Sequence, residues 1–410
     1  MKREAQVGRH RVLVTGFMLV IITVFLGTLI GYPGEAIGAA NNTIKVGWIG
    51  DLTGPASSLF IPYLEAIRNY SRHVNEQGGI NGRKIKLIAE DDRYTIPGAL
   101  AGYKKLVYRN KVTAILGMGG SGQHKALYSQ IERDRVPVIT VSWSGHVSRP
   151  FKRYSFQPTD DCIDEIKLMV DYLVNIIKVK DLRLAYVYAD NEAGKAGLDQ
   201  LKKSVSHYGI DIMSKEIVNF GDISAITQVL NLKKSKANYI IFVTVGSGLF
   251  SLLRDANKFG FSPTFISTFH AMGEDSVKIA GKGARNLMGV SAFGSWYDSV
   301  PGVSEMKKIT VKYHPETEYS ERMGTHRYYT KGWLTALIFA EGAKRAGETI
   351  DGEALIAGLE RIKNLDTKGL SAPITYGPKK RKANDSGKFY KADLEKGYFV
   401  TITDWIKPMH

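Results

Sequence analysis

Short apolar stretches of strand length alternate with amphipathic stretches of helix length from residue 43 to about residue 269. The stretch TIKVGWIG, for example, is followed by Ile61, Leu64 and Ile67, which share one face of a helix. Because the connections are short, consecutive strands must run parallel, and such a sheet is covered by helices on both faces. The sequence therefore predicts an α/β fold with parallel-sheet cores.

The alternation is interrupted at 154–161, YSFQPTDD, and then starts again. A chain of 410 residues is long enough for two domains, so we expect two Rossmann-like lobes of similar design. Beyond Met288 the alternation weakens. Helices are predicted at 329–347 and 352–364, and strands at 372–378 and 397–405 with the basic turn GPKKRK between them.

The N-terminal segment has the order of features found in secretory signal peptides. A basic start is followed by an almost wholly apolar run at 12–30 and then by small residues. We therefore predict a signal peptide at 1–40 with cleavage near 38–40. The alternative is an uncleaved membrane anchor, since the run approaches the length of a spanning helix. Both interpretations place the body of the protein in the periplasm or elsewhere outside the cytoplasm.

The composition excludes several classes of function. The net charge of +16 could attract nucleic acid, but the densest basic run, GPKKRK, contains no aromatic residue, and no nucleic-acid-binding motif is present. The histidines lack metal-ligand spacing, so we expect no metal and no other cofactor. The single cysteine, Cys162, cannot form an intramolecular disulfide and is expected to be buried.

The stretch ILGMGGSGQHKAL, 115–127, fits two enzyme motifs incompletely. Its glycines match G-x-G-x-x-G, but the next strand ends in TVSWS and lacks the acidic residue that binds a dinucleotide ribose. Ser121 stands in a G-x-S-x-G-like context, but Gln123 replaces the last glycine, so a serine hydrolase is the weaker alternative. A loop of small residues that opens a helix exposes N–H groups, which can bind a carboxylate together with Ser121.

Several segments together resemble a known family. IKVGWIGDLTGP, NEQGGINGRKIKLIAEDD, ILGMGGSGQ, RVPVITVSWS and LAYVYADNEAGKAGLDQLKK are similar to segments of Leu/Ile/Val-type ABC-transporter substrate-binding proteins. The resemblance implies a type I periplasmic-binding-protein fold, with two lobes joined by three hinge crossovers. Lobe 1 would comprise 41–158 and 290–362, and lobe 2 would comprise 159–289 and 363–410. It also implies a monomer that is not an enzyme and that delivers a small ligand to a membrane permease.

The same resemblance assigns candidate ligand-binding residues. In the first lobe, the positions that match the family's carboxylate-binding loops and side-chain contact are Leu59, Phe60, Gly120, Ser121, Ser142, Trp143 and Ser144. In the second lobe, the matching positions are Ala193, Val245, Gly246, Phe269 and His270.

The second-lobe positions depart from the pattern of amino-acid binders. Ala193 stands where a tyrosine is common, and Phe269 or His270 stands where a carboxylate pairs with the ligand ammonium. Asp190 and Glu192 are the acids that could substitute. A buried ammonium without a partner binds poorly, so an aromatic or branched organic acid is favoured over an amino acid. A membrane-tethered sensor of the same fold, anchored through 12–30, remains an alternative function.

Overall fold

The computed structural model describes residues 43–409. The predicted signal peptide at 1–40, its cleavage site and the alternative membrane anchor lie outside the described residues. Across 43–409, none of the helices combines the length and the apolar character needed to cross a membrane.

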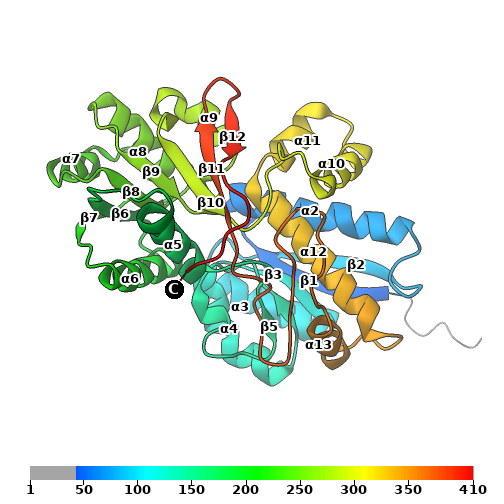
Figure 1. Cartoon of the computed structure of the whole chain (residues 1–410). Coiled ribbons are helices and arrows are strands. Elements are labelled where there is room, and N and C mark those ends of the chain that lie inside the picture. The colour runs from blue at the N-terminus through cyan, green and yellow to red at the C-terminus, as the bar shows by residue number, and fades with distance from the viewer. Residues whose placement is uncertain (1–42, 410) are drawn as a thin grey trace, which may run out of the picture. The chain divides into compact units, whose positions relative to one another are not determined.

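The first sheet consists of five parallel strands in the order β2-β1-β3-β4-β5 (Figure 1). Its strands are β1 (Thr43–Gly50), β2 (Lys84–Asp91), β3 (Ala114–Met118), β4 (Val138–Ile139) and β5 (Ser155–Phe156). The connecting helices are α2 (Ser57–Glu76), α3 (Ile96–Lys104) and α4 (Ser121–Asp134).

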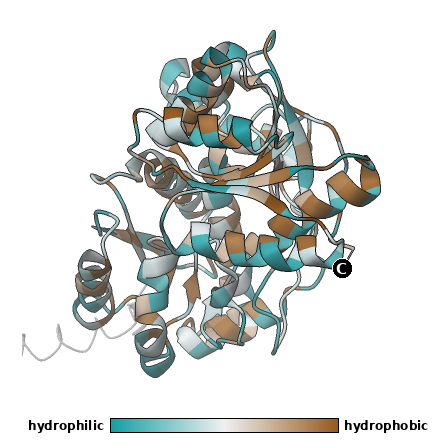
Figure 2. Ribbon diagram, turned by 90° about the vertical axis from the view of Figure 1, so that its left-hand side faces the viewer, coloured by the Kyte–Doolittle hydropathy of each residue, from teal (hydrophilic) through white to brown (hydrophobic). Residues whose placement is uncertain are grey.

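Neighbouring residues of β1 show how this sheet is covered on both faces. The ring of Trp48 lies 6.4 Å from the ring of Phe60 in α2, whereas Ile49 packs against Gly102 in α3. Successive side chains of a strand point to opposite faces, so α2 and α3 cover opposite sides of the sheet. In Figure 2, hydrophobic residues lie in the strands and on the helices that pack against them, as expected for sheets buried on both faces.

The second sheet has seven strands in the order β12-β11-β10-β9-β8-β6-β7 (Figure 1). They are β6 (Leu184–Tyr188), β7 (Ile212–Ile217), β8 (Tyr239–Val243), β9 (Thr264–Ser267), β10 (Leu287–Ser291), β11 (Lys388–Asp393) and β12 (Tyr398–Thr401). Only the pairings of β11 with β10 and β12 are antiparallel. The helices along this part of the chain are α5 (Cys162–Asp171), α6 (Glu192–His207), α7 (Ile226–Lys234), α8 (Gly246–Lys258) and α9 (Asp275–Ala280).

The second sheet is also buried on both faces. Tyr186 of β6 donates a hydrogen bond to the carbonyl of Gly194 in α6, 3.2 Å away. The adjacent Val187 belongs instead to a hydrophobic cluster with Val229 of α7 and Leu252 of α8. The two lobes therefore share one design, as the repeated strand–helix pattern predicted.

The chain passes three times between the two sheets. The first passage follows β5, the second follows β10, and the third precedes β11. The passages lie beside one another: Gln157 donates its N–H to the carbonyl of Arg381, and Phe293 forms a bridge with Ser371. This arrangement of two parallel-rich sheets joined by three crossovers confirms the predicted fold.

Four helices between β10 and β11 complete the molecule. They are α10 (Pro301–Tyr313), α11 (Thr317–Gly324), α12 (Arg327–Ala346) and α13 (Gly352–Glu360). Helix α12 packs closely on α2, because a Cβ atom at Gly332 would lie only 2.2 Å from the carbonyl oxygen of Tyr63. This packing returns α12 to the first sheet and brings its first turns to the junction of the lobes.

The predicted strand at 372–378 is wrong. Leu365 and Ile374 form only an isolated bridge, and the strand that pairs with β12 is β11 instead. The run GPKKRK is also not a simple solvated turn. Arg381 is buried and donates to the carbonyl of Arg153, while Lys382 pairs with Asp164. These basic side chains therefore join the crossovers to neighbouring elements.

Candidate ligand-binding site

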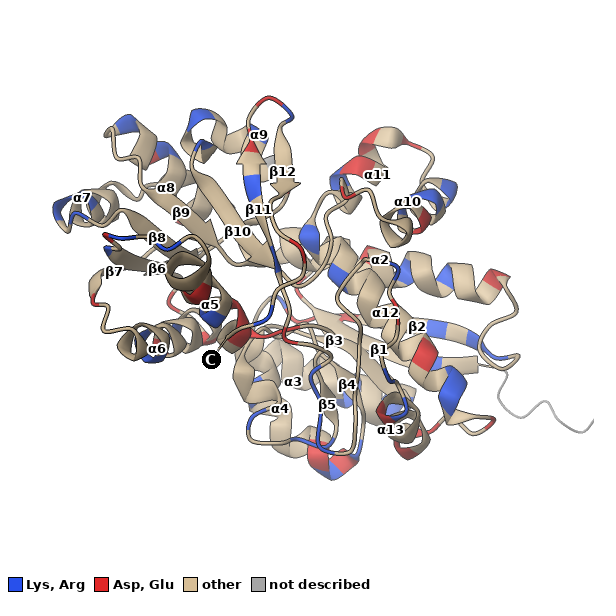
Figure 3. Ribbon diagram, viewed as in Figure 1, with Lys and Arg blue, Asp and Glu red and all other residues tan. Residues whose placement is uncertain are grey.

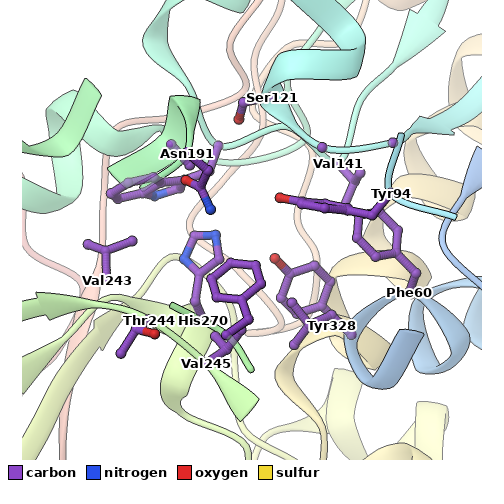
Figure 4. Close-up of a pocket in the computed structure, with 16 residues that line it drawn as sticks. Phe60, Tyr94, Ser121, Val141, Asn191, Val243, Thr244, Val245, His270 and Tyr328 are labelled. Carbon is purple, nitrogen blue, oxygen red and sulfur yellow. The ribbon is translucent and has the colours of Figure 1, made fainter. Parts of the chain in front are cut away.

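A small cavity lies where the carboxyl ends of the strands of the two lobes meet (Figure 4). Its lining comes from the loops after β1 to β4, from the loops after β6 to β9 and from the first turn of α12. The cavity encloses only about 30 Å³, room for one or two waters. A ligand of amino-acid size can therefore enter only if the lobes or the lining side chains move apart.

Most of the predicted binding residues line this cavity. They are Leu59, Phe60, Gly120, Ser121, Trp143, Ala193, Val245 and His270. The other predicted residues are not part of its lining. Ser142 and Ser144 bond to Ser121 from behind, and Phe269 stacks on His270 with ring centroids 4.1 Å apart. Gly246 begins α8 with φ +61, a conformation that favours glycine.

The first-lobe end of the cavity is formed by the start of α4. Gly119 has φ +40, and a Cβ at Gly120 would lie 2.8 Å from the ring of Tyr94, so both positions require glycine. Gly120 is the N-cap residue, and Ser121 is the first helical residue. The first N–H groups of a helix have no partner within it, so this loop presents donors toward the cavity.

The hydroxyl group of Ser121 is oriented by its neighbours. Its Oγ accepts hydrogen bonds from the Ser142 hydroxyl at 3.0 Å and from the backbone N–H of Ser144 at 3.3 Å. A hydroxyl group has two acceptor sites and one donor. Since both acceptor sites are occupied, the hydroxyl hydrogen of Ser121 is left to donate to a ligand.

Aromatic side chains form the walls of the cavity. Phe60, Tyr94 and Tyr328 surround one side, with the ring centroid of Phe60 6.1 Å from that of Tyr94 and 6.2 Å from that of Tyr328 (Figure 4). The Tyr94 ring also contacts Phe220 of the second lobe at 6.2 Å. This pair joins the two lobes across the site and must separate when they open.

The second lobe contributes two further helix starts. Asn191 is the N-cap of α6, where its side chain accepts the N–H of Gly194 at 2.9 Å, and Val245 is the N-cap of α8. Both residues line the cavity. With α4, three helix N-termini therefore surround one space, and their dipoles together favour a negative charge there.

His270 is a neutral polar group in the cavity. Its Nδ1 lies 2.9 Å from the Thr268 hydroxyl, and its ring makes an edge contact with Trp143 at 4.9 Å. Burial, assisted by the nearby charge of Lys331, holds the pKa of His270 well below its ordinary value. The imidazole therefore carries no charge at neutral pH.

The lining contains no acidic side chain, no lysine and no arginine. The acids that could substitute as ammonium partners have other roles. Asp190 pairs with Lys195 at 2.7 Å, and Glu192 pairs across the lobes with Lys125 at 2.9 Å. In this conformation, neither Asp190 nor Glu192 is among the residues that line the cavity.

Some lining residues were not predicted from the sequence: Tyr94, Gly119, Val141, Asn191, Phe220, Val243, Thr244 and Tyr328. Asn191 and Thr244 lie in or beside polar stretches at predicted strand ends. The rule that ligands bind beyond the carboxyl ends of parallel strands could therefore have found them. Phe220 and Tyr328 carried no such signal, because the first lies in an irregular loop and the second in a helix far along the chain.

One buried carboxylate lies behind the wall of the site. Asp92 accepts the N–H of Tyr94 through Oδ1 at 2.8 Å, and its Oδ2 has no hydrogen-bond partner among the described residues. Burial, with help from Asp51 and Asp91, raises the pKa of Asp92 to about 6. At pH values between the ordinary pKa of an aspartate and about 6, the folded protein binds more protons than the unfolded chain. Stability is therefore lost as the pH rises through this range.

Asp92→Asn should therefore remove part of the pH dependence of stability. When the pH is raised from about 5 to about 7.5, the free energy of unfolding of the variant should increase by about 1 kcal/mol relative to that of the unmodified protein. Urea titrations at both pH values measure this difference. A difference that does not change with pH would show that Asp92 is already ionised at the lower pH.

The fold and the cavity together define a class of two-lobed ligand-binding proteins that enclose a solute between parallel sheets. The model of the periplasmic binding protein family matches residues 43–397, and the chain belongs to that family. Family membership confirms the resemblance to Leu/Ile/Val-type binding proteins and indicates a location outside the cytoplasm. The proteins of this family bind solutes and are not enzymes.

Individual relatives agree with this assignment. The Leu/Ile/Val-binding protein homolog 7 of Brucella suis is 22% identical over 337 residues, which cover 77% of this chain and 83% of that protein. A branched-chain amino acid ABC transporter protein from Thermus thermophilus with bound valine superposes with a TM-score of 0.82, at 21% identity and over 89% and 97% of the two chains.

A solute-binding protein of an ABC transporter from Rhodopseudomonas palustris BisB5, in complex with 3,4-dihydroxybenzoic acid, superposes with a TM-score of 0.77. It is 19% identical, and the match covers 90% of this chain and 98% of that chain. At these identities, the solved structures show that the fold is shared.

Proposed function

We propose that the protein is the solute-binding component of an ABC importer and that its ligand is a small organic acid without an α-amino group, aromatic or branched. The two lobes close on this ligand and deliver it to a membrane permease. The observation that carries the proposal is the Ser121 hydroxyl, whose acceptor sites are both filled, at a cavity without charged lining residues.

A carboxylate suits the first-lobe end of the cavity. It accepts hydrogen bonds only, and Ser121 together with the first N–H groups of α4 supplies donors only. The starts of α6 and α8 add to the favourable potential from the opposite side. The site can therefore hold an anion without a lysine or an arginine.

An α-ammonium group does not suit the second-lobe end. Ala193, Val245 and His270 line that region, and the pKa of His270 keeps its ring neutral. A buried ammonium needs an acidic partner to offset its loss of hydration. Asp92 does not line the cavity. A zwitterionic amino acid would therefore bind less well than the corresponding acid.

The walls suit an aromatic or branched body. Phe60, Trp143 and Tyr328 present flat apolar surfaces, and aromatic rings favour edge or offset contacts with one another. The solved relatives accommodate both valine and 3,4-dihydroxybenzoic acid, so the shared fold can hold either kind of ligand. The uncharged second-lobe wall supports the choice of an acid.

We also propose how the chain divides into lobes and how it is exported. Lobe 1 comprises 41–158 with 290–362 and lobe 2 comprises 159–289 with 363–410, a division supported by the membership of β1–β5 and β6–β12 in separate sheets. The exported protein is cleaved near 38–40 and acts as a monomer. An intact N-terminus on the exported protein would instead support a tethered sensor.

The hydrolase alternative has little support. The hydrogen bonds of the Ser121 side chain, within residues 43–409, are to Ser142 and Ser144. His124 contacts the hydroxyls of Thr140 and Ser155, and His270 contacts Thr268. Across the described residues, the hydrogen-bond partners of Ser121 therefore do not include a histidine that could remove its proton in this conformation.

Tryptophan fluorescence tests the proposed function. Aromatic and branched organic acids, titrated separately, should change the emission of the protein at micromolar concentrations, because Trp143 forms part of the cavity wall. Trp143→Phe should lose most of this change. If no organic acid altered either the emission or the melting temperature, the proposal would be wrong.

A further inference from the structure

Three buried ionisable side chains lie directly behind the cavity wall. Asp160 lies two residues before α5 and Glu165 lies in its first turn, a region rich in acidic residues in Figure 3, and Lys331 comes from α12. Each of the three is at most 1% exposed. The site as described above does not use them.

This cluster is connected to the cavity through two lining residues. Glu165 Oε2 accepts the indole N–H of Trp143 at 2.9 Å, and the ammonium of Lys331 donates to the carbonyl of Val141 at 3.1 Å. Trp143 and Val141 both line the cavity. A charge in the cluster therefore lies one residue behind the ligand, in surroundings that screen it poorly.

The cluster has more acceptor atoms than donors. Across the described part of the chain, Glu165 Oε1 and both carboxyl oxygens of Asp160 have no hydrogen-bond partner. Lys331, whose ammonium also lies 4.6 Å from the centre of the Phe269 ring, is the cation shared by the two acids. If both acids were ionised, the cluster would hold an uncompensated buried negative charge, which is costly.

The surrounding groups do not supply a second cation. Asp161 is paired with Arg149, and Asp164 is paired with Lys382. His270 faces Lys331 as a neutral ring, and burial raises the pKa of the Cys162 thiol well above its ordinary value. The Tyr328 hydroxyl, near Glu165, also stays protonated because burial raises its pKa. One proton shared by Asp160 and Glu165 is the remaining way to neutralise the cluster.

We propose that Asp160, Glu165 and Lys331 select the charge of the ligand, because the two acids hold one proton between them at neutral pH. A neutral cluster accepts a ligand carboxylate on the other side of Trp143. Loss of the proton leaves a net negative charge behind the wall, which repels a carboxylate and attracts an ammonium. The ligand part of this inference rests on the proposed function.

The direction of the pKa shifts agrees with the proposal. Burial raises the pKa of both Asp160 and Glu165 well above the ordinary values. The nearby Asp164 raises the pKa of Asp160 further, and Asp160 in turn raises the pKa of Glu165. Burial lowers the pKa of Lys331, against the attraction of the two acids. Burial therefore favours the neutral form of each group, while the attraction between Lys331 and the two acids favours ionisation of the lysine and of one acid.

Infrared spectroscopy of the ligand-free protein tests the shared proton. At neutral pH the protein should show the C=O stretch of a buried protonated carboxyl group. This band should disappear in Asp160→Asn and also in Glu165→Gln, because the charge of Lys331 then compensates that of the one remaining acid. Asp190→Asn, which changes an exposed acid paired with Lys195, is the control and should keep the band. A band that persists in both cluster variants, or is absent from the unmodified protein, would overturn the proposal.

Binding measurements test the effect on ligand charge. Above the pKa of the pair, the affinity for 3-phenylpropanoate should fall as the pH rises, and the loss should approach about tenfold per pH unit. The affinity for the uncharged 3-phenylpropanamide should not change over the same range. In Asp160→Asn, the affinity for the acid should not depend on pH over the same range. An equal pH dependence in both proteins would contradict the proposal. If the acid did not bind at any pH but the infrared band behaved as expected, the proposed function would fail and the shared proton would stand.

Discussion

Replacing Arg327 by methionine should lower the free energy of unfolding by about 3–5 kcal/mol, because the change leaves a buried carboxylate without its partner. The Arg327 guanidinium lies 3.2 Å from Glu274, and these side chains are 1% and 2% exposed. It also donates to the carbonyl of Met272 at 3.2 Å and lies 4.1 Å from the centre of the Tyr390 ring. Urea denaturation measures the loss.

Two further variants show whether the loss comes from the unpaired charge. Arg327→Met combined with Glu274→Gln should recover a large part of the lost stability, because no buried charge remains. Lys368→Met removes an exposed partner of Glu305, and its loss of stability should be much smaller, because water screens exposed ion pairs. Equal losses for Arg327→Met and Lys368→Met would show that the buried pair does not hold the start of α12 to the second lobe.

Ser121→Ala should weaken ligand binding by about 1–3 kcal/mol, which is roughly a 5- to 150-fold loss of affinity. The variant removes the Ser121 hydroxyl hydrogen that the proposed carboxylate would accept, and it leaves the Ser142 hydroxyl without its acceptor. The small cavity offers little space for a compensating water. Isothermal titration with an organic acid found in the fluorescence experiment measures the effect.

The chain offers a matched control for this variant. Ser57 is the first residue of α2, as Ser121 is the first residue of α4, but it does not line the cavity. Ser57→Ala therefore makes the same change at a helix start and should leave the affinity unaltered. An unchanged affinity in Ser121→Ala would remove Ser121 from the site.

Much of the first-lobe lining could be predicted because the family resemblance and the local strand pattern point to the same residues. Gly120 and Ser121 come just after a clear strand, and Trp143 comes after the next one, so the rule that ligands bind at strand ends applies. Tyr328 could not be found in this way. It reaches the cavity only because the third crossover and the packing of α12 on α2 return a late helix to the first sheet.

The buried charges show a second limit of sequence reasoning. Acidic side chains favour helix N-termini, so the sequence alone predicts that both Asp160 and Asp161 cap the helix that follows them. Asp161 does cap α5, with its side chain accepting the N–H of Ile163 at 2.9 Å, but the carboxyl group of Asp160 is buried without a hydrogen-bond partner among the described residues. Adjacent residues point in different directions, and only the positions of α5 and α12 decide which acid faces Lys331.

A thermal-shift experiment with matched ligands tests the central claim most directly. Leucine and phenylalanine are compared with 4-methylpentanoate and 3-phenylpropanoate, which lack the α-amino group. A ligand that binds only the folded state at about 100 times its Kd adds about 2.7 kcal/mol to stability and raises the Tm. The account predicts a rise with one or both acids and a smaller or no rise with the amino acids. A rise with the amino acids alone would contradict it and would point to Asp92 as an ammonium partner.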